Sequence, residues 1–158
     1  MYRSVKQILP IIFILLVNCG FKTLDKSSLN NFKINEINTI GDKRINFLVK
    51  NKITKFFNSD NPQELLNINL NIKKEKSIKE KNKKNKITKY KIEVVSNFKI
   101  TFLNKNISKD FTIIEEGYYN VNDNNNTNRE NQKTLEINLS EKISEKIVKN
   151  IFYVLDDN

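Results

Sequence analysis

Two runs of alternating apolar and polar residues constrain the fold of this chain more than any other feature. In the first run, asparagines separate four aliphatic residues: Leu66, Ile68, Leu70 and Ile72. In the second run, every other residue from Tyr90 to Phe102 is apolar except Ser96. Successive side chains of a β-strand point to opposite faces. The two runs therefore predict two strands of one sheet with a buried face and a wet face.

Two further strands are predicted on either side of these runs. The apolar residues of the segment 32–40 slip in spacing between Ile34 and Ile37, which indicates either a β-bulge or an early end of the strand. After a tight reversal at residues 104–106, a fourth strand carries Phe111, Ile113 and Ile114 and continues to two tyrosines. The lysine-rich segment in between is expected to interrupt the two alternating runs.

A helix is predicted directly after the first strand. Asp42 is a good N-cap, and the apolar residues that follow recur at helical spacing: Ile45, Leu48, Val49, Ile53 and Phe56. The turn cluster that ends at Pro62 stops this helix near Asn58, because proline cannot continue it.

The C-terminal part allows two interpretations. Apolar residues recur in steps of four: Leu135, Leu139, Ile143, Ile147 and Ile151. Residues 135–139 also alternate as in a strand, and Ser140 could then cap a shorter helix. No turn residue interrupts the segment, so we favour one helix from about Arg129 to Tyr153. The element order β-α-β-β-β-α predicts an α+β, two-layer sandwich, with two helices packed on one face of a four-stranded mixed sheet over residues 32–155.

The N-terminus has the pattern of a bacterial lipoprotein signal. Arg3 and Lys6 precede a short apolar run that ends in Leu16-Val17-Asn18-Cys19-Gly20. A helix that spans a bilayer needs roughly 20 apolar residues, so this shorter run indicates a cleaved signal peptide over residues 1–18. Two other interpretations remain open, a general secretion signal with an incidental cysteine and an uncleaved membrane anchor.

The thiol of Cys19 would take a diacylglycerol, and cleavage before Cys19 would then free its amine for a further acyl chain. We expect covalent diacylglycerol and an N-acyl chain such as palmitate on Cys19, followed by a tether over residues 19–31. Two or more acyl chains hold a protein firmly on a membrane, whereas one chain binds reversibly. Gly20 favours the outer membrane of a Gram-negative cell, because lipoproteins of the inner membrane typically carry aspartate at this position. No other cofactor and no metal are expected.

Most of the formal net charge of +10 is concentrated in one segment. Residues 73–91 hold ten lysines against two glutamates. If the flanking strands form a hairpin, its mobile tip carries Lys79, Lys81, Lys83, Lys84 and Lys86. These ammonium groups could meet anionic groups of a ligand, or they could belong to a solvated loop whose charge only keeps the chain soluble.

Three passages resemble the LptE family of lipopolysaccharide-assembly lipoproteins. The first is Cys19-Gly20-Phe21-Lys22 with Leu24, the second is Ile87-Thr88-Lys89-Tyr90, and the third is Gly117-Tyr118-Tyr119-Asn120-Val121. The resemblance rests on the order and spacing of these passages and on the order of the predicted elements. It extends over essentially the whole chain after the signal. The chain departs from the family at Thr23, Leu24 and Asp25 and in lacking alanines in the last helix.

The resemblance implies a lipoprotein that plugs and helps to assemble the outer-membrane β-barrel translocon, an LptD-like protein, and assists the transfer of lipopolysaccharide to the outer leaflet. Such a protein is lipid-anchored in the outer membrane and faces the periplasm and the barrel lumen. The resemblance also strengthens the hypothesis that the five tip lysines bind lipopolysaccharide. Four aromatic residues are candidate barrel contacts, although ordinary packing explains each of them as well: Phe21, Phe57, Tyr118 and Tyr119.

The residue types argue against an enzyme. The chain has no histidine, and its one cysteine is assigned to lipid attachment. Glu115 and Glu116 are adjacent, so on a strand they point to opposite faces and cannot act as an acid/base pair on one substrate. Two alternatives remain: a periplasm-facing lipoprotein that binds an anionic ligand without a barrel, and a basic nucleic-acid-binding protein on an uncleaved anchor. The export signal argues against the latter and against a nucleic-acid partner.

Overall fold

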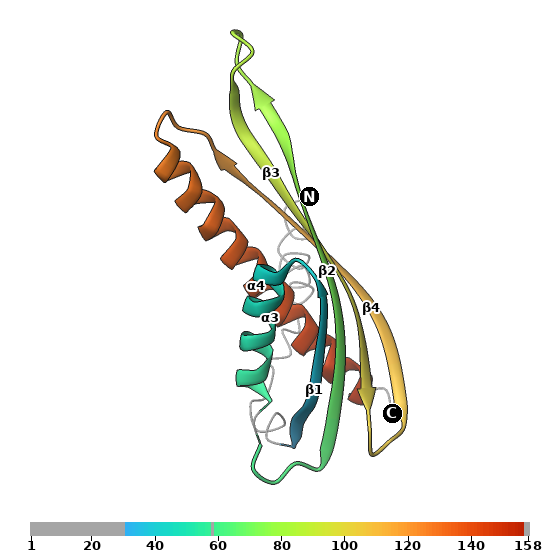
Figure 1. The fold of residues 1–158 in the computed structure, drawn as a ribbon. Helices are drawn as coiled ribbons and strands as arrows, with labels where there is room; N and C mark the ends of the chain where they lie inside the picture. The colour runs from blue at the N-terminus through green and yellow to red at the C-terminus, as the bar shows by residue number, and fades with distance from the viewer. Residues whose placement is uncertain (1–30, 58, 157–158) are drawn as a thin grey trace, which may run out of the picture.

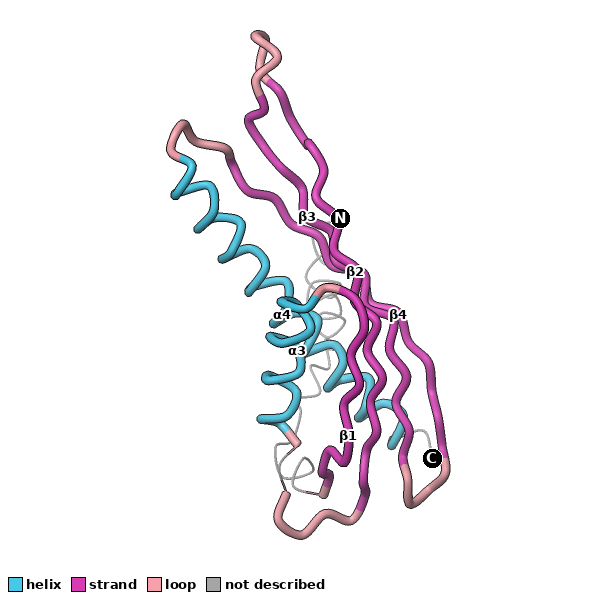
Figure 2. The backbone as a smooth tube through the Cα atoms, in the orientation of Figure 1, coloured by secondary structure: helices cyan, strands magenta, loops and turns pink. Residues whose placement is uncertain are grey.

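In the computed structural model, which describes residues 31–57 and 59–156, one sheet lies against two helices (Figures 1 and 2). The elements are β1 (Phe32–Gly41), α3 (Lys43–Phe56), β2 (Glu64–Lys81), β3 (Ile87–Phe102), β4 (Ile107–Asn120) and α4 (Asn125–Asp156). This confirms the predicted α+β class and element order. The predicted signal peptide and nearly all of the tether, with Cys19 and Phe21, lie outside the described residues.

The sheet is mixed and has the strand order β1-β2-β3-β4. β1 is parallel to β2, whereas the β2–β3 and β3–β4 pairs are antiparallel. The register of β1 shifts between Ile34 and Glu36, which confirms the predicted bulge. β1 ends at Gly41 opposite Ile72, but β2 and β3 stay paired as far as Lys81 and Ile87. The β2–β3 hairpin therefore projects beyond β1.

One face of the sheet is buried under the two helices, as the alternation predicted. Side chains from all four strands and both helices fill this core, and these six members are fully buried: Leu66, Ile72, Ile92, Ile100, Ile53 and Ile143. Each such aliphatic side chain contributes roughly 1.5–3 kcal/mol through burial. The other face carries the asparagines of β2 and has no helix on it (Figure 1).

The start of α3 is determined by local hydrogen bonds. The Asp42 carboxylate accepts a hydrogen bond from the backbone N–H of Ile45 at 2.9 Å, which confirms the predicted N-cap. The side-chain amide of Asn46 donates to the carbonyl of Ile40 at 2.9 Å and so fastens the first turn to β1. Gly41, directly before the cap, adopts a φ of +100°, and a Cβ there would lie 2.0 Å from the carbonyl oxygen of Ile72. The chain can turn this close to β2 only because the residue is glycine.

The C-terminal segment is one helix, and the alternative of a strand followed by a shorter helix is wrong. α4 begins at Asn125, earlier than the expected Arg129. Ser140 is inside the helix, where its hydroxyl donates to the carbonyl of Glu136 at 2.7 Å. A buried serine can satisfy its hydroxyl in this way without ending the helix. None of the described helices is both long and apolar enough to cross a membrane.

The expected interruption between the two alternating runs is much shorter than predicted. β2 continues through the lysines as far as Lys81, and only residues 82–86 form the turn. Antiparallel pairing with β3 supplies the backbone hydrogen bonds here, so a poor strand composition does not end β2. Lys79 and Lys81 are consequently strand residues, whereas Lys83, Lys84 and Lys86 belong to the turn.

Candidate functional site

The turn at the end of the hairpin is organised by Asn82. Its backbone N–H donates to the carbonyl of Lys86 at 2.9 Å, and its carbonyl accepts from the N–H of Asn85 at 2.9 Å. Its side-chain oxygen also accepts from the backbone N–H groups of Lys84 at 2.9 Å and Lys86 at 3.0 Å. Asn85 has a φ of +62°, in the left-handed region that asparagine tolerates better than most residues. The turn lysines therefore extend from a hydrogen-bonded scaffold.

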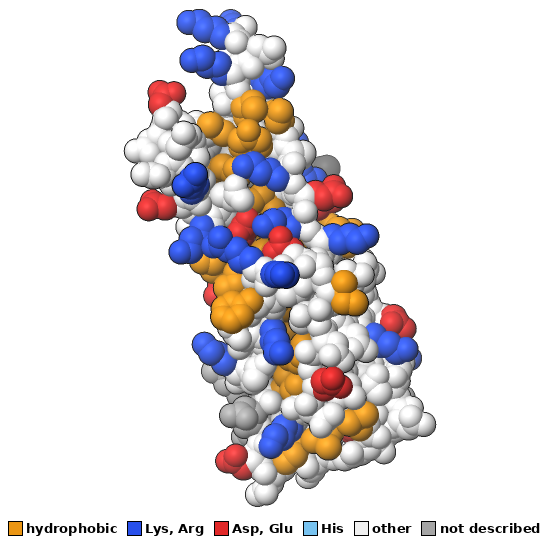
Figure 3. Space-filling model, viewed as in Figure 1, with side chains coloured by type: hydrophobic (Ala, Val, Ile, Leu, Met, Phe, Trp, Pro, Cys, Tyr) orange, Lys and Arg blue, Asp and Glu red, His pale blue; other side chains and the backbone are white. Residues whose placement is uncertain are grey.

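Four lysines at this end are exposed and make no ion pair with any described residue: Lys81, Lys83, Lys84 and Lys86. Figure 3 shows basic side chains gathered at the tip and an apolar patch directly below them. Residues of this part of the hairpin that supply apolar surface include Ile78, which is 48% exposed, and the half-buried Tyr90. We call the four lysines the tip cluster. Closely spaced ammonium groups without internal partners are available to an external anion.

Lys79, the fifth predicted residue, differs from the tip cluster. The register between β2 and β3 shifts between Ile78 and Glu80, so Lys79 lies at a bulge. Its ammonium lies 5.3 Å from the centre of the Tyr118 ring, on the face without helices. The structure thus places four of the five predicted lysines together and turns Lys79 toward an aromatic side chain.

Other lysines of the same block are used inside the molecule. The ammonium of Lys74 lies 3.0 Å from the carboxylate of Asp42 and 3.1 Å from that of Glu136, and Arg44 approaches Glu136 at 3.2 Å. Burial of Lys74 alone would lower its pKa, but the hydrogen bonds to the two carboxylates outweigh this and raise it. This charge network joins α3, β2 and α4 below the hairpin.

Lys76 packs on two aromatic rings nearer the tip. Its ammonium is 4.1 Å from the centre of the Tyr90 ring and 5.2 Å from that of Tyr119. It also donates to the side-chain oxygen of Gln132 on α4 at 2.9 Å. Contacts of this kind stabilise a cation against an aromatic face. Lys76 therefore connects the hairpin to α4 and is not a free charge.

On the opposite face Lys91 bridges two carboxylates. Its ammonium lies 2.5 Å from Glu116 and 2.7 Å from Glu93, and the Tyr118 hydroxyl donates to Glu116 at 2.6 Å. Hydrogen bonds to Glu116 and then Glu93 raise the pKa of Lys91, while the bonds from Lys91 and Tyr118 lower the pKa of Glu116. The same bond to Glu116 raises the pKa of the Tyr118 hydroxyl. The single ammonium of Lys91 is thus shared by two carboxylates in an internal ion-pair network.

The structure separates the candidate barrel contacts. Phe57 is 1% exposed, and its ring packs edge-on against Phe32 at 6.4 Å between ring centres. Tyr119 is also buried and lies against Tyr90. The rings of Phe57 and Tyr119 are therefore unavailable to a partner in this conformation, in agreement with the ordinary-packing interpretation. Tyr118 is 43% exposed and remains a surface aromatic.

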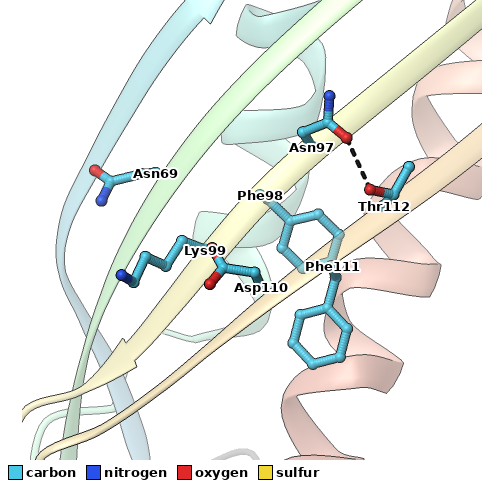
Figure 4. A pocket seen from close by; sticks show the side chains of 7 residues that line it. All are labelled: Asn69, Asn97, Phe98, Lys99, Asp110, Phe111 and Thr112. Carbon is cyan, nitrogen blue, oxygen red and sulfur yellow. Dashed lines mark hydrogen bonds between the residues drawn. The ribbon is translucent and has the colours of Figure 1, made fainter.

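A polar depression lies on the sheet face without helices (Figure 4). The side chains of Asn97 and Thr112 are joined by a hydrogen bond of 2.8 Å, and Lys99 and Asp110 lie beside them. Asparagine pairs on neighbouring strands extend this surface toward β1, with Asn38 donating to Asn69 at 3.2 Å. The sequence analysis did not identify this depression, although an asparagine at every second position of β2 was its signal.

The carboxylates of β4 are placed as the strand period predicted. Glu115 faces α4, where Lys146 lies 2.5 Å from it, and Glu116 belongs to the network on the opposite face. Among the described residues no group of three or more histidines, cysteines, aspartates or glutamates could hold a metal ion.

The comparisons with known proteins establish the fold. No family model matches the sequence, and no curated protein matches it. Rare lipoprotein B from Shewanella oneidensis has a similar structure, with a TM-score of 0.52 and 12% identity over 76% of this chain and 98% of that chain. A candidate lipoprotein from Caulobacter crescentus gives a TM-score of 0.59 and 10% identity over 84% of this chain and 96% of that chain. At this level of identity the similarity shows a shared fold.

Proposed function

We propose that this protein is an LptE-like lipoprotein of the outer membrane that partners the β-barrel lipopolysaccharide translocon and assists lipopolysaccharide transfer. The tip cluster is the observation that carries the proposal. Its four ammonium groups have no ion-pair partner among the described residues and extend from the end of a projecting hairpin. The phosphates of lipid A and the carboxylates of the inner core are anions that such a group could bind.

The shared fold supports the proposal. Both similar structures come from proteins described as lipoproteins, and each is covered almost completely by the match. The pattern around Cys19 independently predicts lipid attachment for this chain. β1 begins at the end of the sheet opposite the hairpin tip (Figure 1).

The proposed role is non-enzymatic. The carboxylate pair Glu115 and Glu116 is divided between two faces, and each carboxylate has an ion-pair partner of its own. A protein that binds lipopolysaccharide and plugs a barrel needs contact surfaces and does not need a reacting group. Tyr118 is the exposed aromatic that we assign to a barrel contact.

The first test compares two charge-neutralised variants in lipopolysaccharide binding. The first carries glutamine at the four positions of the tip cluster. The control carries glutamine at four exposed lysines elsewhere: Lys43, Lys50, Lys105 and Lys133. Both variants lose the same net charge. Exposed ion pairs contribute up to about 1 kcal/mol each, so we expect binding at least about tenfold weaker for the tip variant and little change for the control. Equal losses would show that only net charge matters and would refute the site.

The second test asks about the partner and the anchor. A tagged protein is purified from detergent-solubilised outer membranes, and its N-terminus and partners are identified by mass spectrometry. Acylated Cys19 with a stoichiometric barrel supports the proposal. Acylated Cys19 without a barrel favours a lipoprotein that binds an anionic ligand alone. An intact Met1 would overturn the localisation, and a Cys19→Ala variant is expected to leave the membrane.

A further inference from the structure

The two edges of the sheet differ in how they are protected against pairing with another chain. One edge consists of β1 and, beyond Gly41, of the outer part of β2. It is irregular, with one register shift in β1 and two near the end of β2. Its outer part carries five lysines: Lys73, Lys74, Lys76, Lys79 and Lys81. Bulges and lysines are the usual means by which proteins prevent the addition of a strand at an edge.

The other edge, formed by β4, has much less of this protection, because its one lysine, Lys109, lies near the start of the strand. β4 is paired with β3 in unbroken register from Ile107 to Asn120, and it contains no proline. Among the described elements, only β3 forms backbone hydrogen bonds with β4, and it does so on the inner side of the strand. Its central residues 111–114 are uncharged. A long, regular edge with an uncharged centre can pair with an extended chain.

The two adjacent carboxylates of β4 do not oppose such pairing, because each has an ion-pair partner, and the other two charged residues of β4, Lys109 and Asp110, lie near the start of the strand. Lys146 lies 2.5 Å from Glu115 on the helix side of the strand. Lys91 lies 2.5 Å from Glu116 on the other side. An incoming strand would therefore meet carboxylates that already have partners.

Next to this edge, on the helix side, is a basic depression of about 500 Å³. It is lined by residues of β4 and α4: Glu115, Lys142, Glu145, Lys146 and Lys149. Lys142 has no carboxylate partner among the described residues, and the ammonium of Lys149 lies 5.6 Å from the centre of the Tyr153 ring. Two lysines are thus available to acidic groups that approach along β4.

The opposite side of the same edge exposes two large apolar side chains, one on either side of the ion-paired Glu116. Ile114 is 58% exposed and Tyr118 is 43% exposed, and both lie on the face without helices. The two sides of β4 therefore present different chemistry to a strand laid beside it. The strand period would bring alternate side chains of that strand to the two sides.

We propose that β4 is the docking edge for an extended segment of another protein, which adds to the sheet as a fifth strand. This segment alternates acidic side chains, which face Lys142 and Lys149, with apolar side chains, which face Ile114 and Tyr118. Backbone hydrogen bonds to β4 supply the affinity, and the two rows of side chains supply the specificity. This proposal does not need the lipopolysaccharide site, because the tip cluster contributes no residue to this edge; Tyr118, assigned above to a barrel contact, is the one residue that the two proposals share.

The test uses the purified full-length protein and a capped eight-residue peptide that alternates valine with glutamate. Binding is measured by fluorescence anisotropy, and the location is read from hydrogen–deuterium exchange. We expect slower exchange of the amides of residues 107–120, by about tenfold at saturating peptide. Protection of β1, of the outer part of β2 or of the tip in place of β4 would overturn the proposal, as would the absence of binding at millimolar peptide.

Two further peptides separate strand addition from charge attraction. A version N-methylated at every backbone amide keeps all side chains but cannot donate hydrogen bonds, so it should not bind. A version with lysine in place of glutamate should bind at least about tenfold more weakly, because it brings like charges to Lys142 and Lys149. Equal binding of the N-methylated peptide would show attraction to the surface without strand addition.

Matched protein variants test the specificity. Lys142→Glu combined with Lys149→Glu should weaken binding of the valine–glutamate peptide about tenfold. The control, Lys50→Glu combined with Lys133→Glu, has the same change in net charge at exposed helix positions away from the depression and should bind like the unchanged protein. Circular dichroism verifies the fold of both. Equal affinities of the two variants would refute the assignment of the acidic row.

Discussion

The ammonium of Lys74 on β2 lies 3.1 Å from a carboxylate oxygen of Glu136 on α4, and this pair joins the projecting hairpin to the long helix. Glu136 is 1% exposed and Lys74 is partly buried. Asp42 and Arg44 approach the same pair from the start of α3. Three segments far apart in the sequence thus meet through one set of charges.

Removal of Glu136 should destabilise the protein strongly. Glu136→Ala leaves Lys74 and Arg44 beside a site without its carboxylate, and the loss of one partner of a buried pair costs about 3 kcal/mol. The control is Glu141→Ala, which breaks only the exposed ion pair with Lys52 and should cost less than about 1 kcal/mol. Urea unfolding measures both free energies. Similar small losses would mean that the network contributes little to stability.

Protonation of Asp42 should contribute to loss of stability in acid. Hydrogen bonds from the Ile45 N–H and Lys74 outweigh partial burial and lower the pKa of Asp42 below its usual 3.8. The unfolded state therefore takes up this proton first, so the stabilisation is present above about pH 4 and is lost as the pH falls through the lowered pKa. Asp42→Asn keeps a capping side chain but has no charge. The difference in unfolding free energy between the two proteins should shrink below pH 4, and a pH-independent difference would contradict this.

The two glycines of the described segments should respond differently to alanine. A Cβ at Gly41 would meet the backbone oxygen of Ile72 at 2.0 Å, and its φ of +100° is unfavourable for alanine. We expect Gly41→Ala to cost at least about 3 kcal/mol. A Cβ at Gly117 would meet the flexible end of Leu135, so Gly117→Ala should cost about 1 kcal/mol. Thermal unfolding compares them, and equal shifts in Tm would refute the backbone argument.

The local stability of the turn at residues 82–86 should depend on the side chain of Asn82. Asn82→Ala removes the oxygen that accepts from the N–H groups of Lys84 and Lys86. Each hydrogen bond of this kind makes a net contribution of about 1 kcal/mol to stability. The turn should therefore open locally in the variant while the core is unaffected. Faster amide exchange confined to residues 82–86 is the expected result. Asn85→Gly is the matched control and should leave exchange nearly unchanged, because glycine adopts the left-handed conformation readily.

Local patterns predicted the elements well where burial and periodicity agree. The bulge in β1, the cap at Asp42 and the alternation in β2 and β3 each depend on interactions among residues close in sequence or on one buried face. The lysine-rich part of β2 was predicted wrongly as an interruption. Its composition disfavours a strand, but pairing with β3 over the whole hairpin overrides that preference.

The candidate site was only partly predictable. The sequence indicated a cluster of lysines but could not separate Lys74 and Lys76, which are used in contacts with α4, from the four that remain free. The assignment depends on which lysines face the helix layer and which lie beyond it. That in turn depends on where β1 and α4 end relative to the hairpin, a relationship between distant segments.

The sequence by itself determined the class of fold, the buried face and the position of the basic segment, because hydrophobic periodicity and capping act locally. Only the tertiary structure decided which charges are neutralised and which edge of the sheet is unprotected. Lys74 meets Glu136, and Lys146 meets Glu115, across separations that no local pattern encodes. The attraction between two charges near the protein surface is weak unless they lie within a few ångströms of each other. It therefore depends on how α4 packs against the sheet.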